Sequence, residues 1–263
     1  MGIEQFDLSG KVAFITGGNG GIGRAMALGF AGCGADVAIA ARNSDKLKAV
    51  LEELHATGRR AIEVCCNVEE QASIDAAIRR TVAELGGIDI AVNNAGINGR
   101  VPTPQDISAE TWNSVLRTNL TGAHFVSVRV REEMVRRGGG KIINISSMLA
   151  IFGGKTLAAY AASKGGLEQY TRSCAVAWAK DNIQVNAIEP GWIATAMTTR
   201  SQQEPKKYLN LIDRTPAGRY GQPTDLVGAA VFLASKASDF VTGACIPVDG
   251  GYSIQGTSVI IDI

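Results

Sequence analysis

The residues of this sequence best suited to acid–base chemistry are a tyrosine and a lysine four positions apart, Tyr160 and Lys164. Within a helix this spacing places the phenol and the ammonium on one face, about 5–6 Å apart. A free tyrosine, with a pKa near ~10, transfers protons poorly at neutral pH, whereas an adjacent ammonium favours the phenolate and lowers that pKa. Ser147, at the end of an expected strand thirteen residues earlier, could bring a hydroxyl to the same helix face. The pair alone is not specific, since such pairs also occur on ordinary helix surfaces.

A glycine-rich turn, Thr-Gly-Gly-Asn-Gly-Gly-Ile-Gly at residues 16–23, stands between an expected strand and an expected helix. Glycine lets the chain turn tightly and lets a pyrophosphate approach the free N–H groups of the helix N-terminus. The spacing is one residue wider than in the common dinucleotide fingerprint, and glycine-rich turns also serve purely structural ends. Because this turn follows the first strand and opens a helix, we predict that it binds a dinucleotide, through Gly17, Asn19, Gly20, Gly21, Ile22 and Gly23.

The end of the second expected strand indicates which dinucleotide is bound. An enzyme that uses NAD normally has a carboxylate there for the ribose 2′-hydroxyl, whereas an arginine suits the 2′-phosphate of NADP. This sequence has Ala40, Ala41 and Arg42 at that point. The alternative is an ordinary solvent-exposed arginine at a strand end. We predict that NADP(H) is preferred and that NAD(H) is possible.

Strand-length apolar runs alternate with segments of helical period along the whole chain. Such alternation is typical of parallel strands joined by crossover helices, which bury the sheet on both faces. The sequence therefore predicts an α/β fold: a single domain over residues 1–263 with a doubly wound (Rossmann) parallel sheet of about seven strands and helices on both faces. Residues 189–223 are expected to be irregular and to form a substrate lid. Strands are expected at 12–16, 36–41, 61–66, 88–92, 141–145, 183–188 and 244–248, and helices at 22–32, 44–57, 72–85, 108–137, 158–180 and 225–234.

Composition argues against several classes of partner. The 263 residues contain 26 Lys+Arg and 25 Asp+Glu, so the net charge is +1 and gives no long-range attraction to nucleic acid or an anionic membrane. No uncharged apolar stretch approaches the ~18 residues of a membrane span. The 31 glycines, in a chain that is 46% hydrophobic, must belong to a folded protein that often needs bare backbone. A small-molecule substrate is the expected partner.

The five cysteines favour a reducing compartment. Their number is odd, and the neighbours Cys65 and Cys66 point to opposite faces of an expected strand and cannot easily pair. The N-terminus lacks the basic start and apolar run of a signal peptide, so we expect a cytoplasmic protein. The only histidines, His55 and His124, are far apart and accompanied by no paired cysteines, so no metal site is expected.

Several motifs in a fixed order extend this interpretation to almost the whole chain, from about residue 8 to residue 252. Together they resemble the short-chain dehydrogenase/reductase family, in its compact single-domain branch. They are the glycine turn, Asn-Asn-Ala-Gly at 93–96, Asn119, Ser147, Tyr160 with Lys164, Pro190-Gly191 with Thr195, and Val-Asp-Gly-Gly at 248–251.

The resemblance implies a role for each of these residues. Tyr160 would be the general acid in carbonyl reduction and the base in alcohol oxidation, and Ser147 would bind and polarise the same oxygen. Lys164 would lower the pKa of the tyrosine and hold the nicotinamide ribose, while Asn119 would hold a water that links Lys164 to solvent. The remaining cofactor contacts would be Asn94, Ala95 and Gly96 beside the adenosine ribose and Pro190, Gly191, Ile193 and Thr195 beside the nicotinamide. A homotetramer built through the two long helices and the last strand is also implied.

Three positions depart from the family pattern. Asn67-Val68 replaces the usual Asp-Val, although the amide oxygen of Asn67 could still accept a bond from the adenine amine. Gly20 stands where relatives that use NADP often have a basic residue. Glu189 precedes Pro190 where a small or apolar residue is usual, and the sequence offers no reason for it.

The leading functional hypothesis is a reversible NADP(H)-dependent oxidoreductase that acts on a secondary alcohol or ketone of a polyol, sugar or sugar acid. Arg100 could meet a substrate carboxylate or could be a plain surface charge. One alternative is a 3-ketoacyl-thioester reductase, to whose acyl carrier protein Arg129, Arg131, Arg136 and Arg137 would bind; another is a non-catalytic dinucleotide-sensing protein. The expected substrate pocket comprises Ile97, Asn98, Met148, Leu149, Phe152, Trp192 and Met197.

Overall fold

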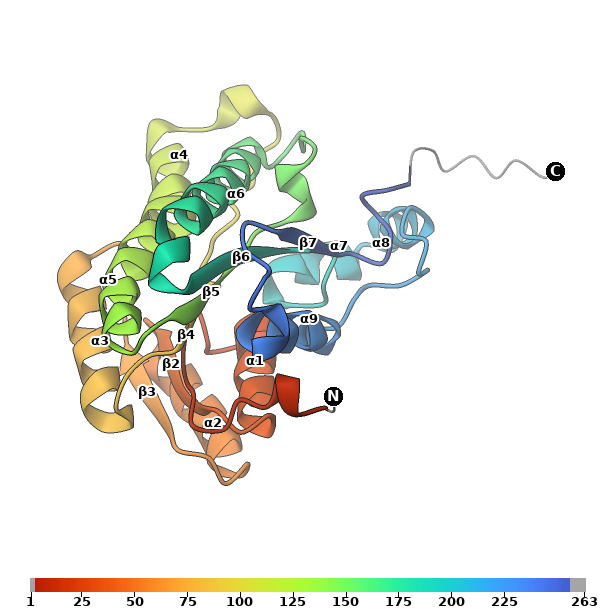
Figure 1. Cartoon of the computed structure of the whole chain (residues 1–263). Helices are drawn as coiled ribbons and strands as arrows, with labels where there is room; N and C mark the ends of the chain where they lie inside the picture. Colours follow the sequence, from red (N-terminus) through yellow and green to blue (C-terminus); the bar gives the residue numbers. More distant parts are fainter. Residues whose placement is uncertain (1–2, 256–263) are drawn as a thin grey trace.

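The protein is described by a computed structural model that covers residues 3–255; the tail 256–263, beyond the last motif of the resemblance, lies outside the described residues. Within this range one sheet of seven parallel strands has the order β3-β2-β1-β4-β5-β6-β7 (Figure 1). This arrangement confirms the predicted fold class. The strands are β1 (Val12–Thr16), β2 (Asp36–Ala41), β3 (Ala61–Cys65), β4 (Ile90–Asn93), β5 (Gly140–Ile145), β6 (Ile183–Pro190) and β7 (Cys245–Val248).

The strand order reverses at β1, which pairs with β2 on one side and with β4 on the other. Ligands of such open sheets bind outside the carboxyl ends of the strands at this reversal. The glycine turn follows β1, Asn94 follows β4, and Ser147 follows β5 after one further residue. The topology therefore brings motifs that are far apart in sequence to one edge of the sheet.

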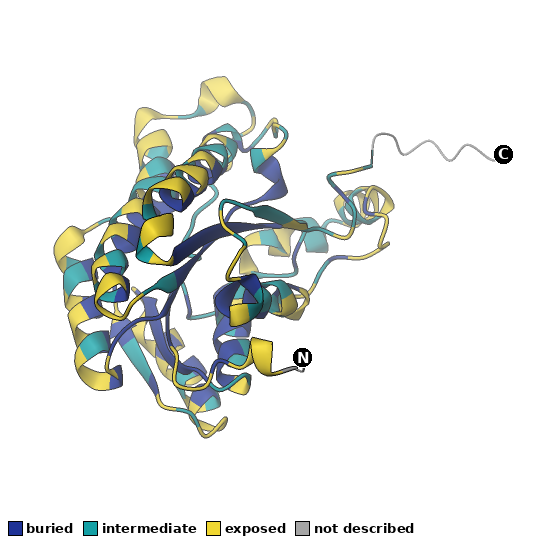
Figure 2. Cartoon of the chain, in the orientation of Figure 1, coloured by how far each residue is buried: buried dark blue, intermediate teal, exposed yellow. Residues whose placement is uncertain are grey.

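Helices cover both faces of the sheet, and a separate apolar core lies under each face. Every residue of β1, β2 and β6 is buried, as expected for parallel strands covered on both sides. Figure 2 shows these buried strands between helices whose outer faces are exposed. One layer contains α1 (Gly21–Gly32), α2 (Ser44–His55) and α9 (Val227–Ala234); the other contains α3 (Gln71–Leu85), α4 (Ala109–Leu116), α5 (Gly122–Arg136) and α6 (Ala158–Trp178).

The long helix expected over 108–137 is interrupted in its middle. A π-helical segment, Arg117–Thr121, separates α4 from α5 and contains Asn119. The Asn119 side chain bonds to both backbone groups of Ile97, accepting from its N–H at 2.9 Å and donating to its carbonyl at 2.9 Å. Such π-helical turns are frequently found at functional sites.

The segment 189–223 is irregular only in part, so the prediction of an irregular segment is wrong for the residues that form β6 and two helices. β6 runs on to Pro190, and two helices follow, α7 (Thr199–Gln203) and α8 (Pro205–Asp213), which lie beyond the ends of β6 and β7 in Figure 1. Pro205 occupies the first turn of α8, where a missing N–H costs nothing, so this proline starts a helix instead of preventing one. Tyr208 of α8 stacks on Tyr220, with ring centroids 5.3 Å apart, and anchors the helix. None of the helices in the described residues is long and apolar enough to cross a membrane.

Candidate active site

A cavity of about 340 Å³ opens at the edge of the sheet where the motifs meet. Most of the predicted cofactor and catalytic residues line it, although they come from five separate parts of the chain. These residues are Gly17, Asn19, Gly20, Gly21, Ile22, Asn94, Ala95, Gly96, Ser147, Tyr160, Lys164, Pro190, Gly191, Ile193 and Thr195.

The glycine turn leaves room for a phosphate against bare backbone. Helix α1 begins after Gly20, which offers no side chain to cap the first N–H groups. A Cβ atom on Gly23 would lie 2.4 Å from the carbonyl oxygen of Gly17, so only glycine permits this close approach. Asn94 holds the turn from the other side, since its Nδ2 donates to the carbonyl oxygens of Thr16 and Gly17 at 3.0 Å each. The uncapped helix end and the bare backbone fit a dinucleotide pyrophosphate.

Five of the predicted residues do not line the cavity: Gly23, Arg42, Asn67, Val68 and Asn119. Arg42 is exposed at the end of β2, next to the glycine turn, where the Gly17 N–H donates to the Ala40 carbonyl. Asn67 already accepts a bond from the Glu69 N–H at 3.3 Å. Their roles toward a cofactor stay predictions.

Lys46 lines the cavity and was not predicted. It sits in the first turn of α2, where the Asn43 side chain caps the helix by accepting from the Lys46 N–H at 3.0 Å. The sequence signal that could have placed Lys46 is Asn43, a preferred helix N-cap residue directly after Arg42. It fixes where α2 begins, and therefore puts Lys46 in the first helical turn after β2.

Tyr160 and Lys164 lie on α6 as their spacing predicts, with the Lys164 Nζ 5.5 Å from the centroid of the Tyr160 ring. Lys164 is almost completely buried and donates a hydrogen bond of 2.6 Å to the Ile145 carbonyl at the end of β5. Burial lowers the pKa of this ammonium to about 8. The bond to Ile145 fixes Lys164 at the carboxyl edge of the sheet.

The pKa of Tyr160 differs from the sequence expectation. Burial raises it to about 12, and a hydrogen bond with Ser147 opposes the rise without cancelling it. In the protein without a cofactor, therefore, Lys164 does not lower the pKa of Tyr160 below its usual value. The loss of solvent around the phenol has a larger effect than the ammonium of Lys164. A phenol with this pKa is protonated at neutral pH, which suits a proton donor.

Asn119 lies behind Gly96 and close to Lys164. A Cβ on Gly96 would be 3.3 Å from the Asn119 Oδ1 and 3.8 Å from the Lys164 Nζ. The amide of Asn119 is fully used, because its Nδ2 also donates to the Ser163 hydroxyl at 3.0 Å. Its contribution visible in the structure is to join the π-helical segment to α6 and to the loop that carries Gly96.

The cavity lining includes five of the seven residues of the expected substrate pocket. Asn98, Met148, Leu149, Trp192 and Met197 line it, whereas Ile97 and Phe152 do not. Phe152 instead packs beside Tyr252, with ring centroids 5.9 Å apart. Arg100 also lines the cavity, and its Nη1 donates to the Thr156 hydroxyl at 3.0 Å. Its guanidinium is one of three cationic groups in this lining, with Lys46 and Lys164.

Comparison with known proteins identifies this arrangement. A sequence model of a protein family, described as enoyl-(acyl carrier protein) reductase, matches residues 17–253. The 2-dehydro-3-deoxy-D-gluconate 5-dehydrogenase of Escherichia coli strain K12 is 43% identical over 253 residues, which cover 96% of this chain and 99% of that protein. The chain belongs to the short-chain dehydrogenase/reductase family. The resemblance drawn from the motifs is thereby confirmed.

Other short-chain dehydrogenases similar to this chain act on related compounds. The 5-keto-D-gluconate 5-reductase of Escherichia coli strain K12 is 43% identical over 248 residues, covering 94% of this chain and 97% of that protein. The crystal structure of a gluconate 5-dehydrogenase from Burkholderia cenocepacia in complex with NADP and tartrate matches with a TM-score of 0.92 at 40% identity, over 96% of this chain and 99% of that one.

Proposed function

We propose that this protein is an NADP(H)-dependent oxidoreductase that interconverts a secondary hydroxyl and a ketone on a sugar acid of the gluconate class. The observation that carries the proposal is the meeting of Ser147, Tyr160 and Lys164 with the glycine turn in one cavity. The substrate class is supported by Arg100 on the cavity wall and by relatives, 43% identical, that are named for gluconate derivatives.

The bound dinucleotide supplies or accepts the hydride, and the chain supplies the proton and the geometry. In ketone reduction the Tyr160 phenol, protonated at neutral pH, donates its proton to the carbonyl oxygen while the Ser147 hydroxyl binds that oxygen. In alcohol oxidation Tyr160 must first release its proton to solvent, and the phenolate, which the nearby Lys164 ammonium favours, then takes the proton of the hydroxyl. Residues 17–23 would hold the pyrophosphate, and the Pro190–Gly191 wall would hold the nicotinamide end.

We expect Arg42→Ala to raise the KM for NADP about 10- to 100-fold and to leave the KM for NAD within about twofold, because one charge-assisted contact to a phosphate is lost. Steady-state kinetics with both cofactors measure this. Lys48→Ala, an exposed lysine on α2, is the matched control and should change neither value. Near-equal kcat/KM of the unchanged protein for NADH and NADPH would contradict the NADP preference.

We expect Arg100→Met to raise the KM for gluconate about 10- to 100-fold while kcat changes little, because the guanidinium binds the carboxylate in ground and transition state alike. A neutral polyol of similar length should be unaffected. Cofactor absorbance with a panel of sugar acids, polyols and an acetoacetyl thioester measures both effects. Arg80→Met, an exposed arginine on α3 paired with Glu84, serves as the control. Turnover of the thioester but of no sugar acid would refute the proposed substrate class.

The four arginines considered for an acyl carrier protein are already paired within the chain, which gives that alternative little support. Each guanidinium reaches a carboxylate of its own helix or of a neighbouring segment. The pairs are Arg129 with Asp75 and Glu132, Arg131 with Asp181, Arg136 with Glu133, and Arg137 with Asp89. The non-catalytic alternative is also disfavoured, because such proteins typically lose the tyrosine or the lysine that this site retains.

We further propose that the protein is a cytoplasmic homotetramer with residues 189–223 as its substrate lid. Val128 and Val135 on α5 and Val176 on α6 are exposed apolar side chains on the two long helices, and Phe240 is exposed near β7. All five cysteines are free thiols, which supports a reducing compartment. Sedimentation equilibrium should give four times the chain mass, and a monomer would contradict the assembly.

A further inference from the structure

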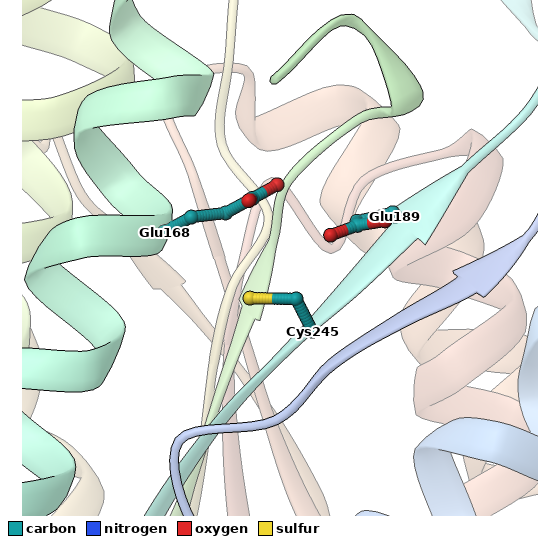
Figure 3. Close-up of side chains that lie close together, drawn as sticks. All are labelled: Glu168, Glu189 and Cys245. Atoms are coloured by element: carbon teal, nitrogen blue, oxygen red, sulfur yellow. The ribbon is translucent and has the colours of Figure 1, made fainter. Parts of the chain in front are cut away.

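Glu189, the residue for which the sequence offered no reason, points at a second buried glutamate. It is the next-to-last residue of β6 and is 3% exposed, and Glu168 of α6 is 6% exposed. Figure 3 shows the two carboxyl groups and the Cys245 thiol of β7 turned toward one another. One oxygen of each carboxyl group and the Cys245 sulfur lie within 4.8 Å of one another. Because a carboxylate has no donor of its own, two carboxyl groups this close can share a hydrogen bond only when one of them carries a proton.

The charges around the pair do not balance two carboxylates. Arg172 of α6 is the cation in contact, with its Nη2 3.6 Å from the Glu168 Oε2 and 3.5 Å from the Cys245 Sγ. Asp249, just after β7, adds negative charge and works in the opposite direction. Burial, and then Glu168, raise the pKa of Glu189 to about 7, and burial raises that of Cys245 to about 11. With one proton on the pair, the Arg172 guanidinium balances the charge that remains on the two glutamates, and Asp249 adds one negative charge beside them.

The Glu168 side of the pair is connected to the catalytic serine. Glu168 lies one helical turn beyond Lys164 on α6, and its Oε1 accepts a 2.8 Å bond from the Ser146 hydroxyl. The Ser146 N–H donates to the Ile188 carbonyl of β6 at 2.8 Å. Ser146 lines the cavity and directly precedes Ser147. By holding Ser146, Glu168 therefore helps to position the backbone of Ser147, which carries the catalytic hydroxyl.

The Glu189 side is connected to the cofactor wall. Glu189 is followed by Pro190 and Gly191, which line the cavity, while Glu189 itself is not part of the lining. The Gly191 N–H donates to the Val248 carbonyl of β7 at 3.1 Å. A displacement of Glu189 would therefore be passed directly to the residues that face the nicotinamide end.

We propose that Glu168 and Glu189 hold one proton between them, and that this shared proton positions the ends of β5 and β6, and with them Ser147 and the Pro190–Gly191 wall, for cofactor binding. The two glutamates are positioning residues, since neither lines the cavity. The inference rests on the proposed use of NADP(H) but not on the identity of the substrate. When the proton leaves, two buried like charges face one arginine, and their repulsion loosens the wall.

The same three side chains could also be considered as ligands of a cation. Two carboxylates and a thiol are plausible ligands for a metal, but Arg172 already occupies contact distance to Glu168 and Cys245 with a positive charge. The high pKa of Cys245 also keeps its sulfur protonated, and a metal ligand must be the thiolate. The contacts favour the proton.

The test compares the unchanged protein with Glu189→Gln, whose amide can still donate to Glu168 but cannot ionise. A group whose folded pKa is raised stabilises the fold at low pH and loses that contribution as pH rises, here between about 4.5 and about 7. Thermal unfolding from about pH 5 to about pH 9 should show Tm of the unchanged protein falling relative to the variant across that window. Over the same pH range, the NADPH affinity of the unchanged protein should fall about 3- to 10-fold relative to that of Glu189→Gln. The two affinities are compared as a ratio at each pH, because the phosphate of NADPH also titrates and affects both proteins alike.

Two further variants and one addition complete the experiment. Glu168→Gln should abolish the same pH step, because its amide oxygen still accepts from Ser146 while the repulsion is gone; it replaces the first variant should that one fail to fold. Glu52→Gln, an exposed glutamate on α2, should leave the step intact. Parallel pH curves for the unchanged protein and both pair variants would overturn the proposal, as would Zn²⁺ that raises Tm only when Glu189 is present. If the unchanged protein shows the pH-dependent fall in NADPH affinity but does not turn over any sugar acid, the result would count against the proposed function and not against the shared proton.

Discussion

Tyr160→Phe should lower kcat about 10²- to 10⁴-fold, the contribution of one well-placed proton donor. NADPH affinity should stay within about twofold, because the variant keeps the ring and loses only the hydroxyl. The variant lacks the phenol whose pKa burial raises to about 12, and with it the hydrogen bond between that phenol and Ser147. Single-turnover kinetics with NADPH and a keto sugar acid measure the chemical step, and fluorescence titration measures cofactor binding.

Tyr170→Phe is the matched control for this experiment. Tyr170 lies on the same helix, and its hydroxyl is 3.2 Å from the His124 Nδ1, away from the cavity lining. It should keep full activity. A Tyr160→Phe variant that retains more than about a tenth of kcat would show that another group donates the proton, and the role assigned to Tyr160 would have to be withdrawn.

The sheet and the site edge could be predicted because both depend on local sequence. The mostly apolar runs of β1 and β2, in which every residue is buried, are typical of a sheet covered on both faces. Strand ends then carry the motifs: the glycine turn after β1, Asn94 after β4 and Ser147 near the end of β5. Because the strands are parallel, their carboxyl ends lie at one edge of the sheet, and the motifs meet there.

Features that depend on the environment of a side chain could not be predicted in the same way. The spacing of Tyr160 and Lys164 places them together but says nothing of how much water surrounds the phenol, and burial reverses the expected direction of its pKa. The pairing of Glu168 with Glu189 joins residues 21 positions apart on a helix and a strand, through contacts that only the packed structure creates. Helices α7 and α8 were not predicted, and Pro205, the proline of these two helices, stands in the first turn of α8.

Lys164→Met should lower kcat/KM about 10²- to 10³-fold, an effect of the size seen when one charge-stabilising donor is removed from an active site. Methionine has nearly the length of lysine and fills the same buried space, but it leaves the Ile145 carbonyl without its 2.6 Å partner. That loss destabilises by about 1–3 kcal/mol, while removal of a buried ammonium acts in the opposite direction. The fold should therefore survive while activity does not. Lys180→Met, an exposed lysine beyond α6, should retain both.

The pH dependence of stability separates the charge of Lys164 from its shape. A base whose folded pKa is lowered, here from 10.5 to about 8, binds its proton less tightly in the folded than in the unfolded chain. The unchanged protein should therefore gain stability relative to Lys164→Met as pH rises from about 8 to about 10.5. Thermal unfolding in the Glu189→Gln background measures this without the glutamate pair. A constant Tm difference across that range would mean that the Lys164 pKa is not depressed, and the lysine would then act without the cost of a buried charge.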